Sequence, residues 1–366
     1  MSDSSVLDLE KKWYTVTLPV KTCSLKDIAN SNTTKEDMDR YFQEAQEVLE
    51  RECSVSSMDR GRWYSSQFLS RGTTSDRIAS AAVKLSDTDF MFFLEGFNLL
   101  FDTARADTHH YEAALKALSA VWPRLLPARP LKRFISQYFA TLPEDEASRN
   151  KVLVYWYLED YLKSTYTQFL SLCESMLKDR IVQRREAWLD LVGKLLCSVA
   201  EGRNTAMAMI IDKLGDPNSQ IAHKAYHHLL TLLSESSTHQ QSLFTELEKI
   251  IFMKNCPLRT MRYAANVMNQ LVYSKDERKL AIKAVQTYLF SVPSAGDHLP
   301  GGLHGDDGDH YRVTSRFSIF WYRYRTSQRT LECAVCAGEY RHLPTTGFYP
   351  FLAPAACPRQ GNPGDV

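Results

Sequence analysis

Two groups of side chains near the middle of the chain have a spacing that permits metal or acid chemistry. His223 and His227 are four residues apart, so a helix would place both imidazoles on one face, as in a metal-binding pair. Asp212 and Asp216 offer two carboxylates at the same spacing. Neither group forms a complete site. No nearby Cys or acidic residue adds a metal ligand to the histidines, and the two aspartates flank a helix end. We interpret the histidines as a solvated or partner-facing surface and the aspartates as capping residues.

Cys333 and Cys336 have the spacing of a metal knuckle, with His342 and Cys357 as candidate further ligands. The intervals between these residues are irregular, and an unstructured tail is the favoured interpretation. We therefore expect no metal. The nearby stretch 316–329 alternates basic and aromatic residues, a composition that single-stranded nucleic-acid binders share with disordered segments.

Motifs of the common enzyme classes are missing from the sequence. It contains no phosphate-binding loop, nucleophile elbow, H-E-x-x-H motif or dinucleotide fingerprint. Aromatic and aliphatic residues recur at helical spacing between Val154 and Leu162, but such a pattern is far more typical of a core helix than of a cofactor site. The sequence predicts a protein that is not an enzyme and has no cofactor and no small-molecule substrate.

Basic residues gather in three short clusters, although the formal net charge of the chain is only +1. A nucleic-acid contact would have to come from such clusters. Lys and Arg at helix ends are equally well explained by the helix dipole, so both interpretations stay open. The RNA-contact candidates are Arg180, Arg184 and Arg185, beside Lys178, and Lys254, Arg259 and Arg262; the third cluster contains Arg124, Arg129, Lys132 and Arg133.

The stretch 209–233 organises these candidates, because it contains the end of one helix, a corner and a second helix. At the corner, which includes Asp212 and Lys213, Gly215 is expected in the left-handed conformation that ends a helix. Asp216 is expected as the N-cap of the next helix, and Pro217 in its first turn. The second helix carries an apolar stripe of Ile221, Ala225, Leu229 and Leu232.

Similar corners recur along the chain. Asp216-Pro217 and Cys256-Pro257 are 40 residues apart, and an earlier corner at Lys178-Asp179 lies about 40 residues further back. This is the period of HEAT or armadillo helix pairs. Because each pair has an apolar face that it cannot bury alone, we predict an all-α fold, an α-solenoid of stacked helix pairs.

Three parts are expected: a poorly ordered N-terminal segment at 1–33, a helical-repeat domain at 34–290 and a disordered tail at 291–366. The tail holds 7 of the 14 prolines and 9 of the 15 glycines, and no lysine. The predicted helices are 34–50, 62–69, 73–85, 87–104, 111–126, 131–142, 148–177, 179–199, 204–214, 217–234, 241–253, 257–273 and 276–290.

The eight cysteines are widely spread, which is typical of reduced thiols in the cytosol or nucleus. No apolar run approaches the roughly 20 residues that cross a bilayer. The first residues, MSDSSVLDLEKK, lack the layout of a signal peptide. We expect an intracellular, soluble protein without a membrane partner.

Several motifs together resemble the CCAAT-binding-factor (CBF) family, which includes nucleolar complex proteins. The match is colinear from about Trp63 to Phe290, roughly 60% of the chain, and residues 291–366 resemble nothing in the family. The most specific pieces are Gly72-Thr73 with Ser75-Asp76-Arg77-Ile78, Trp156 with Glu159-Asp160 and Leu162-Lys163, Asp212-Lys213-Leu214-Gly215-Asp216, and Asn269-Gln270.

The resemblance implies a scaffold of the nucleus and nucleolus that acts in ribosome biogenesis. Such a scaffold pairs with a second nucleolar complex protein and binds large-subunit precursor particles and their pre-ribosomal RNA. Two alternatives are a CCAAT-type transcription factor and a generic HEAT-like adaptor. The near-neutral charge and the lack of a helix-turn-helix or zinc-finger element disfavour the transcription factor.

Overall fold

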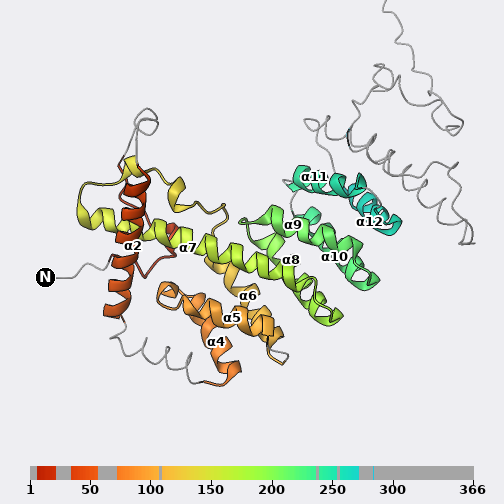
Figure 1. Cartoon of the computed structure of the whole chain (residues 1–366), viewed down its shortest axis with the longest axis horizontal. Helices are drawn as coiled ribbons and strands as arrows, with labels where there is room; N and C mark the ends of the chain where they lie inside the picture. The colour runs from red at the N-terminus through yellow and green to blue at the C-terminus, as the bar shows by residue number, and fades with distance from the viewer. Residues whose placement is uncertain are drawn as a thin grey trace, which may run out of the picture. The chain divides into compact units, whose positions relative to one another are not determined.

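A computed structural model describes residues 6–21, 34–56, 72–106, 109–235, 239–253 and 256–271, together with Lys283. All regular structure in these ranges is helical (Figure 1). The α-helices are α2 (Lys35–Ser56), α4 (Thr74–Leu85), α5 (Glu95–Ala106), α6 (Tyr111–Leu125), α7 (Glu146–Met176), α8 (Val182–Ser198), α9 (Arg203–Asp212), α10 (Ser219–Glu235), α11 (Gln240–Ile251) and α12 (Leu258–Met268). The short 3-10 helices are η1 (Trp13–Thr15), η2 (Phe90–Phe92), η3 (Phe134–Ser136), η4 (Phe139–Thr141) and η5 (Lys213–Gly215).

Helix starts follow the local chemistry of the sequence. Thr34 precedes α2, and its hydroxyl accepts from Asp37 N at 3.2 Å while donating to the Asp37 carboxylate at 2.7 Å. Thr73 and Asp76 make the same reciprocal pair at the start of α4, with distances of 3.3 and 2.6 Å. Each pair satisfies an N–H that the first helical turn leaves without a partner. Thr34 and Thr73 therefore cap the helices that follow them.

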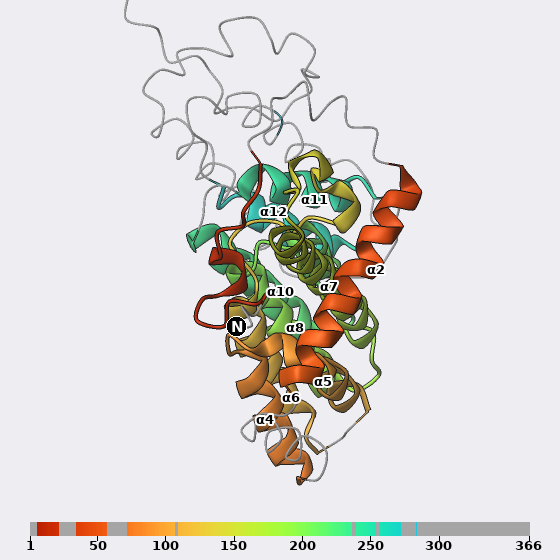
Figure 2. The same cartoon turned by 90° about the vertical axis from the view of Figure 1, so that its left-hand side faces the viewer.

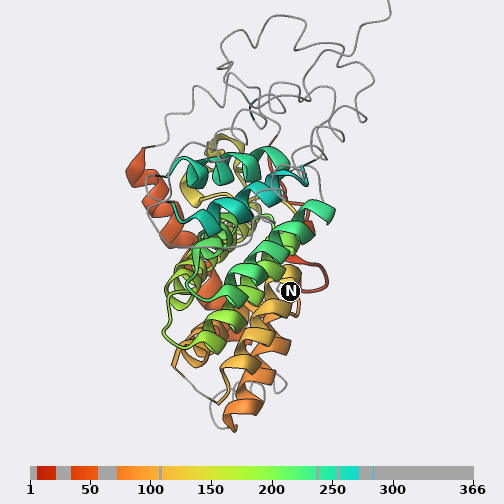
Figure 3. The ribbon, with the colours of Figure 1, turned by 90° about the vertical axis from the view of Figure 1, so that its right-hand side faces the viewer.

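Successive helices pack on one another in chain order. Helices α4, α5 and α6 contact each other, α6 contacts α8, and α8, α9 and α10 contact each other (Figures 1 and 2). Helix α11 then contacts α9 and α12, and this order can be followed from orange through green to blue-green in Figure 3. The apolar stripe of α10, which includes Ile221, Ala225 and Leu229, is buried. The predicted all-α solenoid of stacked helix pairs is confirmed.

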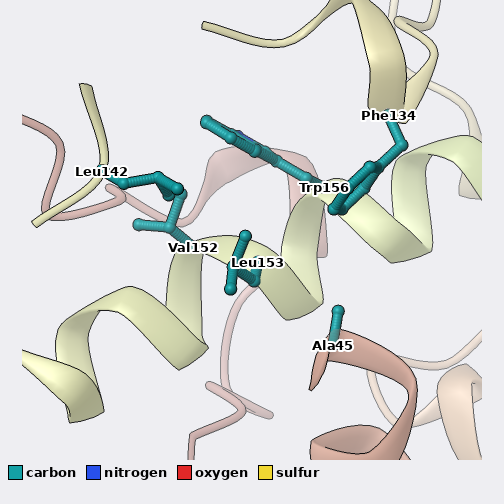
Figure 4. Close-up of a cluster of buried hydrophobic side chains, with 6 residues drawn as sticks. All are labelled: Ala45, Phe134, Leu142, Val152, Leu153 and Trp156. Carbon is teal, nitrogen blue, oxygen red and sulfur yellow. The ribbon is translucent and has the colours of Figure 1, made fainter. Parts of the chain in front are cut away.

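Helix α7 is the longest helix and lies in the interior. Its 31 residues correspond to about 46 Å of helix, and it contacts α2, α5, α8 and α9. Val154, Trp156 and Leu158 are buried in it, as expected of a core helix. One cluster joins three elements: Ala45 from α2, Phe134 from η3, and Val152, Leu153 and Trp156 from α7, together with Leu142 (Figure 4).

The N-terminal segment differs from the expectation of poor order over 1–33. Leu7 and Trp13 are buried. Trp13 Nε1 donates to the Leu125 carbonyl at 2.8 Å, and Asp8 N donates to the Tyr155 hydroxyl at 3.0 Å. Residues 6–21 therefore pack on α6 and α7, because two buried side chains and two long-range hydrogen bonds hold them there.

Two predicted helices are wrong in part. A single helix over 87–104 is interrupted by η2 and an irregular turn, and α5 begins only at Glu95. Phe90, Met91 and Phe93 are all buried there, which one face of a regular helix does not achieve. The helix predicted over 131–142 is absent, and the chain instead makes the two short turns η3 and η4. Carboxylates from other elements accept three of its backbone N–H groups, those of Leu131, Lys132 and Phe134.

The predicted helices at 62–69 and 276–290 and the tail at 291–366 lie outside the described residues, apart from Lys283. No helix among the described residues is long and apolar enough to cross a membrane.

Candidate nucleic-acid interface

The corner at 212–218 is built differently from the sequence prediction. Within the described residues, the glycine with positive φ is Gly202, at 59°, and not Gly215. Gly215 ends η5, and a Cβ there would lie 3.4 Å from the Thr260 hydroxyl of α12. The prediction of a left-handed Gly215 is wrong. A Cβ at 215 would make only ordinary van der Waals contact with α12, so neither the backbone nor the packing requires glycine there.

Asn218, and not Asp216, caps helix α10. The Asn218 Oδ1 accepts from Gln220 N at 2.8 Å and from Ile221 N at 3.4 Å, and α10 begins at Ser219. Pro217 also precedes the helix. The predicted N-cap was therefore placed two residues too early, because the two acceptor side chains, Asp and Asn, compete for the same role.

Asp216 is instead the buried centre of an ionic group. Its carboxylate accepts from Asn218 N at 2.9 Å and lies 3.3 Å from the Arg185 guanidinium. Lys213 Nζ is 3.9 Å away, and both Asp216 and Lys213 are less than a tenth exposed. By contrast, Asp212 is exposed and lies 3.6 Å from Lys213 Nζ. A buried carboxylate with paired cations stabilises a junction only while every partner remains.

Arg259 completes this group, which we call the Asp216 corner (Arg185, Lys213, Asp216 and Arg259). The Arg259 guanidinium donates to the carbonyl of Asp216, and it lies 3.5 Å from the carbonyl of Pro217. It therefore ties α12 to the start of α10. Part of its hydrogen-bonding capacity is used inside the fold.

The other predicted RNA contacts fall into two classes. Arg184 and Arg185 are largely buried: Arg184 donates to the Arg105 carbonyl at 2.5 Å, and Arg185 donates to the Asp179 carbonyl at 2.8 Å. Arg180 and Arg262 are exposed. Lys254 lies outside the described residues. Arg184 and Arg185 therefore bond within the fold, whereas Arg180 and Arg262 lie at the surface.

A second ionic group holds the segment 127–138, which we call the strap, between α6 and α7. Three carboxylates accept its backbone N–H groups: Glu201 from Leu131 at 2.6 Å, Glu159 from Lys132 at 3.0 Å and Asp160 from Phe134 at 3.1 Å. Glu159 and Glu201 are buried. The strap is therefore fixed by tertiary hydrogen bonds in place of helical ones.

Two further contacts complete the attachment of the strap. Lys163 Nζ donates to the Leu131 carbonyl at 2.8 Å and to Glu201 at 2.7 Å. Gln137 donates its side-chain amide to Glu159 at 3.1 Å. The sequence reasoning missed this group. The available signal was a pair of adjacent acids, Glu159-Asp160, inside an otherwise apolar helix, because acids are rarely buried without partners.

Basic and apolar side chains of the strap face outward. Arg129 lies 2.5 Å from Glu159, and Arg133 donates to the Ser164 hydroxyl at 2.6 Å, but both remain about half exposed. Lys132 Nζ lies 5.2 Å from the centre of the Tyr138 ring. Ile135 and Tyr138 are 67% and 52% exposed.

The histidines of α10 form a surface pair. His223 and His227 place their Nε2 atoms 3.0 Å apart on an exposed face. His228 lies on another side of the helix, 3.1 Å from Asp190. In the described ranges, no three His, Cys, Asp or Glu side chains converge as a metal site would require. Cys333 and Cys336 lie outside the described residues.

Helices α8 and α10 are joined by a further ion pair. Lys224 Nζ lies 2.7 Å from both Glu186 and Asp190. Burial alone would lower the pKa of Lys224, but the two carboxylates raise it above its ordinary value. Lys224 therefore stays charged at neutral pH and bridges the two helices.

Comparison with known proteins finds relatives that match 58% to 68% of the chain. No family model matches it. CCAAT/enhancer-binding protein zeta of Mus musculus is 29% identical over 68% of this chain and 25% of its own length. Ribosome biogenesis protein NOC1 of Chaetomium thermophilum is 28% identical over 68% of this chain and 26% of its own. Nucleolar complex protein 1 of Drosophila melanogaster is 26% identical over 58% and 19%.

The chain thus spans about a quarter or less of the length of these relatives. The names of these relatives agree with the family that the sequence motifs resemble. Glu159, Lys163 and Asp216 belong to those motifs, and in the structure they lie in the two ionic groups. By sequence similarity the chain resembles CCAAT/enhancer-binding protein zeta and nucleolar complex proteins of the Noc1 type over 58% to 68% of its own length.

Proposed function

We propose that the chain is a non-catalytic scaffold in ribosome biogenesis, acting in the nucleus and nucleolus on precursors of the large ribosomal subunit. The observation that carries the proposal is the similarity of its helical part to proteins named nucleolar complex protein 1 and ribosome biogenesis protein NOC1. Stacked helix pairs support it, since solenoids offer extended surfaces on which several partners bind at once. The proposed partners are a second nucleolar complex protein and pre-ribosomal RNA.

The RNA contacts are proposed to come from local basic clusters, because the whole chain is nearly neutral. Arg180, Arg259 and Arg262 are exposed members of the predicted set. Arg259, although tied to the Asp216 corner, lies in the first turn of α12, where the helix dipole favours a phosphate. Arg184 and Arg185 make internal bonds and support the corner, so they are weaker candidates.

Affinity purification of the tagged full chain from nuclear extract tests the scaffold role. Co-purification of pre-ribosomal RNA, large-subunit proteins and a nucleolar complex partner is the expected result. Recovery of promoter DNA would favour a CCAAT-type transcription factor, the activity that the name of the mouse relative suggests. Recovery of neither would favour a generic adaptor.

Charge reversal tests the RNA contacts. Changing Arg259 and Arg262 together to Glu should weaken binding to a pre-ribosomal RNA fragment. The slope of log K against log salt concentration should become shallower by about 1 for each phosphate contact that is lost. The helical circular dichroism spectrum should be unchanged. Equal affinity of the double variant and the parent at matched salt would remove this corner from the RNA surface.

A further inference from the structure

The strap presents a fixed row of basic and apolar side chains to solvent. Its backbone is held by Glu159, Asp160 and Glu201, which lie beneath it with side chains that are mostly buried. Because these acids point inward and accept from the main chain, the outer face of the strap is left with Lys132 and Arg133. Arg133 also lies 3.6 Å from the Asp160 carboxylate and stays 44% exposed, so part of its guanidinium faces solvent. The Lys132 ammonium lies over the Tyr138 ring on the outer face.

The outer face also offers surfaces on which a planar group can stack. Tyr138 is half exposed, and one side of its ring carries the Lys132 ammonium 5.2 Å from the ring centre. Ile135 is the most exposed large apolar side chain in the described part of the chain. An aromatic ring beside cations, on a backbone that needs no ordering, is the combination that binds unpaired bases and their phosphates.

We propose that the strap is a binding site for single-stranded RNA, in which Tyr138 stacks on a base, Lys132 and Arg133 hold the adjacent phosphates, and Ile135 contacts the neighbouring base or ribose. The proposal rests on the proposed role in RNA binding and assigns it to a surface away from the Asp216 corner. A single strand fits better than a duplex, because the bases of a duplex are already stacked and leave no face for Tyr138.

Fluorescence anisotropy of the full chain with a labelled 20-nucleotide single-stranded RNA tests this assignment. Tyr138→Ala should weaken binding roughly tenfold, as the loss of one stacked base does, whereas Tyr138→Phe, which keeps the ring, should bind like the parent. Lys132→Ala should reduce the slope of log K against log salt by about 0.7, the value for one phosphate contact on a single strand.

Matched controls come from other exposed side chains. Phe252 is 52% exposed, the same as Tyr138, and Lys194 is an exposed lysine of α8. Phe252→Ala and Lys194→Ala should leave affinity and salt slope unchanged. A duplex of the same length should bind more weakly and should not distinguish Tyr138→Ala from the parent. Circular dichroism and melting temperature confirm that each variant is folded.

The outcomes separate this inference from the proposed function. If the parent binds RNA and the strap variants bind equally well, the strap assignment is overturned while RNA binding stands. If the strap variants keep RNA affinity but lose a nucleolar protein in affinity purification, the strap is a protein-docking surface and the assignment is again wrong. If the parent binds no single-stranded RNA at low salt, both the strap site and the RNA role fail, and only purification with large-subunit proteins can support the scaffold.

Discussion

The Asp216 corner and the strap are both ionic groups at helix junctions, but they differ in how many of their cations remain at the surface. In the corner, one buried carboxylate draws Arg185 and Lys213 inward. In the strap, Glu159 and Glu201 are buried and the outer face carries cations. Whether a basic residue in this fold is structural or available to a ligand therefore depends on the position of the carboxylate beside it. A cluster of Lys and Arg in the sequence does not reveal that position.

The largest effect is expected from removing the corner carboxylate. Asp216→Ala removes the buried carboxylate that Arg185 and Lys213 share, and leaves Lys213 only the exposed Asp212. This should lower the free energy of unfolding by about 3 to 5 kcal/mol. Urea unfolding followed by circular dichroism measures this loss. Asp212→Ala, at the exposed neighbour, should change stability by no more than about 0.5 kcal/mol. Equal effects of the two substitutions would show that Asp216 is not the centre of the corner.

Removing the strap carboxylate should have a smaller and more local effect. Glu159→Ala leaves Lys132 N and the Gln137 amide without an acceptor, at a cost of about 2 to 3 kcal/mol. Glu159→Gln keeps one acceptor oxygen and should lose less. Hydrogen exchange should become faster at the amides of residues 131–137 in Glu159→Ala. Unchanged exchange there would contradict the view that α7 fixes the strap.

The glycines beside the two groups sharpen the comparison. Gly202 follows Glu201, has positive φ, and a Cβ there would lie 2.4 Å from Leu170 Cδ1. Gly202→Ala should therefore cost about 1 to 2 kcal/mol or more. Gly215 precedes Asp216 and has an ordinary φ, so Gly215→Ala should change the unfolding free energy by less than about 1 kcal/mol. Thermal unfolding of the two variants distinguishes them, and a larger loss at 215 would reverse this assignment.

The smallest effects concern single cations at the surface of each group. Arg259→Ala removes hydrogen bonds to the carbonyls of Asp216 and Pro217, and should cost about 1 kcal/mol. Lys132→Ala removes a charge whose contact is with an exposed ring and should cost less than about 0.5 kcal/mol. Chemical denaturation of both variants measures the difference. A loss at Lys132 as large as at Arg259 would mean that the strap cations are also structural.

Much of the fold follows from short-range patterns in the sequence. Thr34 and Thr73 begin their helices because each finds its acceptor and donor partners three residues away. The apolar periodicity of α7 and α10 predicts which faces are buried, and the 40-residue spacing of corners predicts stacked pairs. These features depend on neighbours within a few residues or on a repeat, so the sequence alone determines them.

The two ionic groups depend on partners that are far apart in the chain. Leu131 N reaches Glu201 across 70 residues, and Arg185 reaches Asp216 across 31. The helix expected at 131–142 is lost to such bonds, and the left-handed turn is at Gly202 and not at Gly215. Only the tertiary structure decides these points, because a backbone N–H or a guanidinium bonds to whichever acceptor the packed helices bring within reach, and local sequence does not encode that distance.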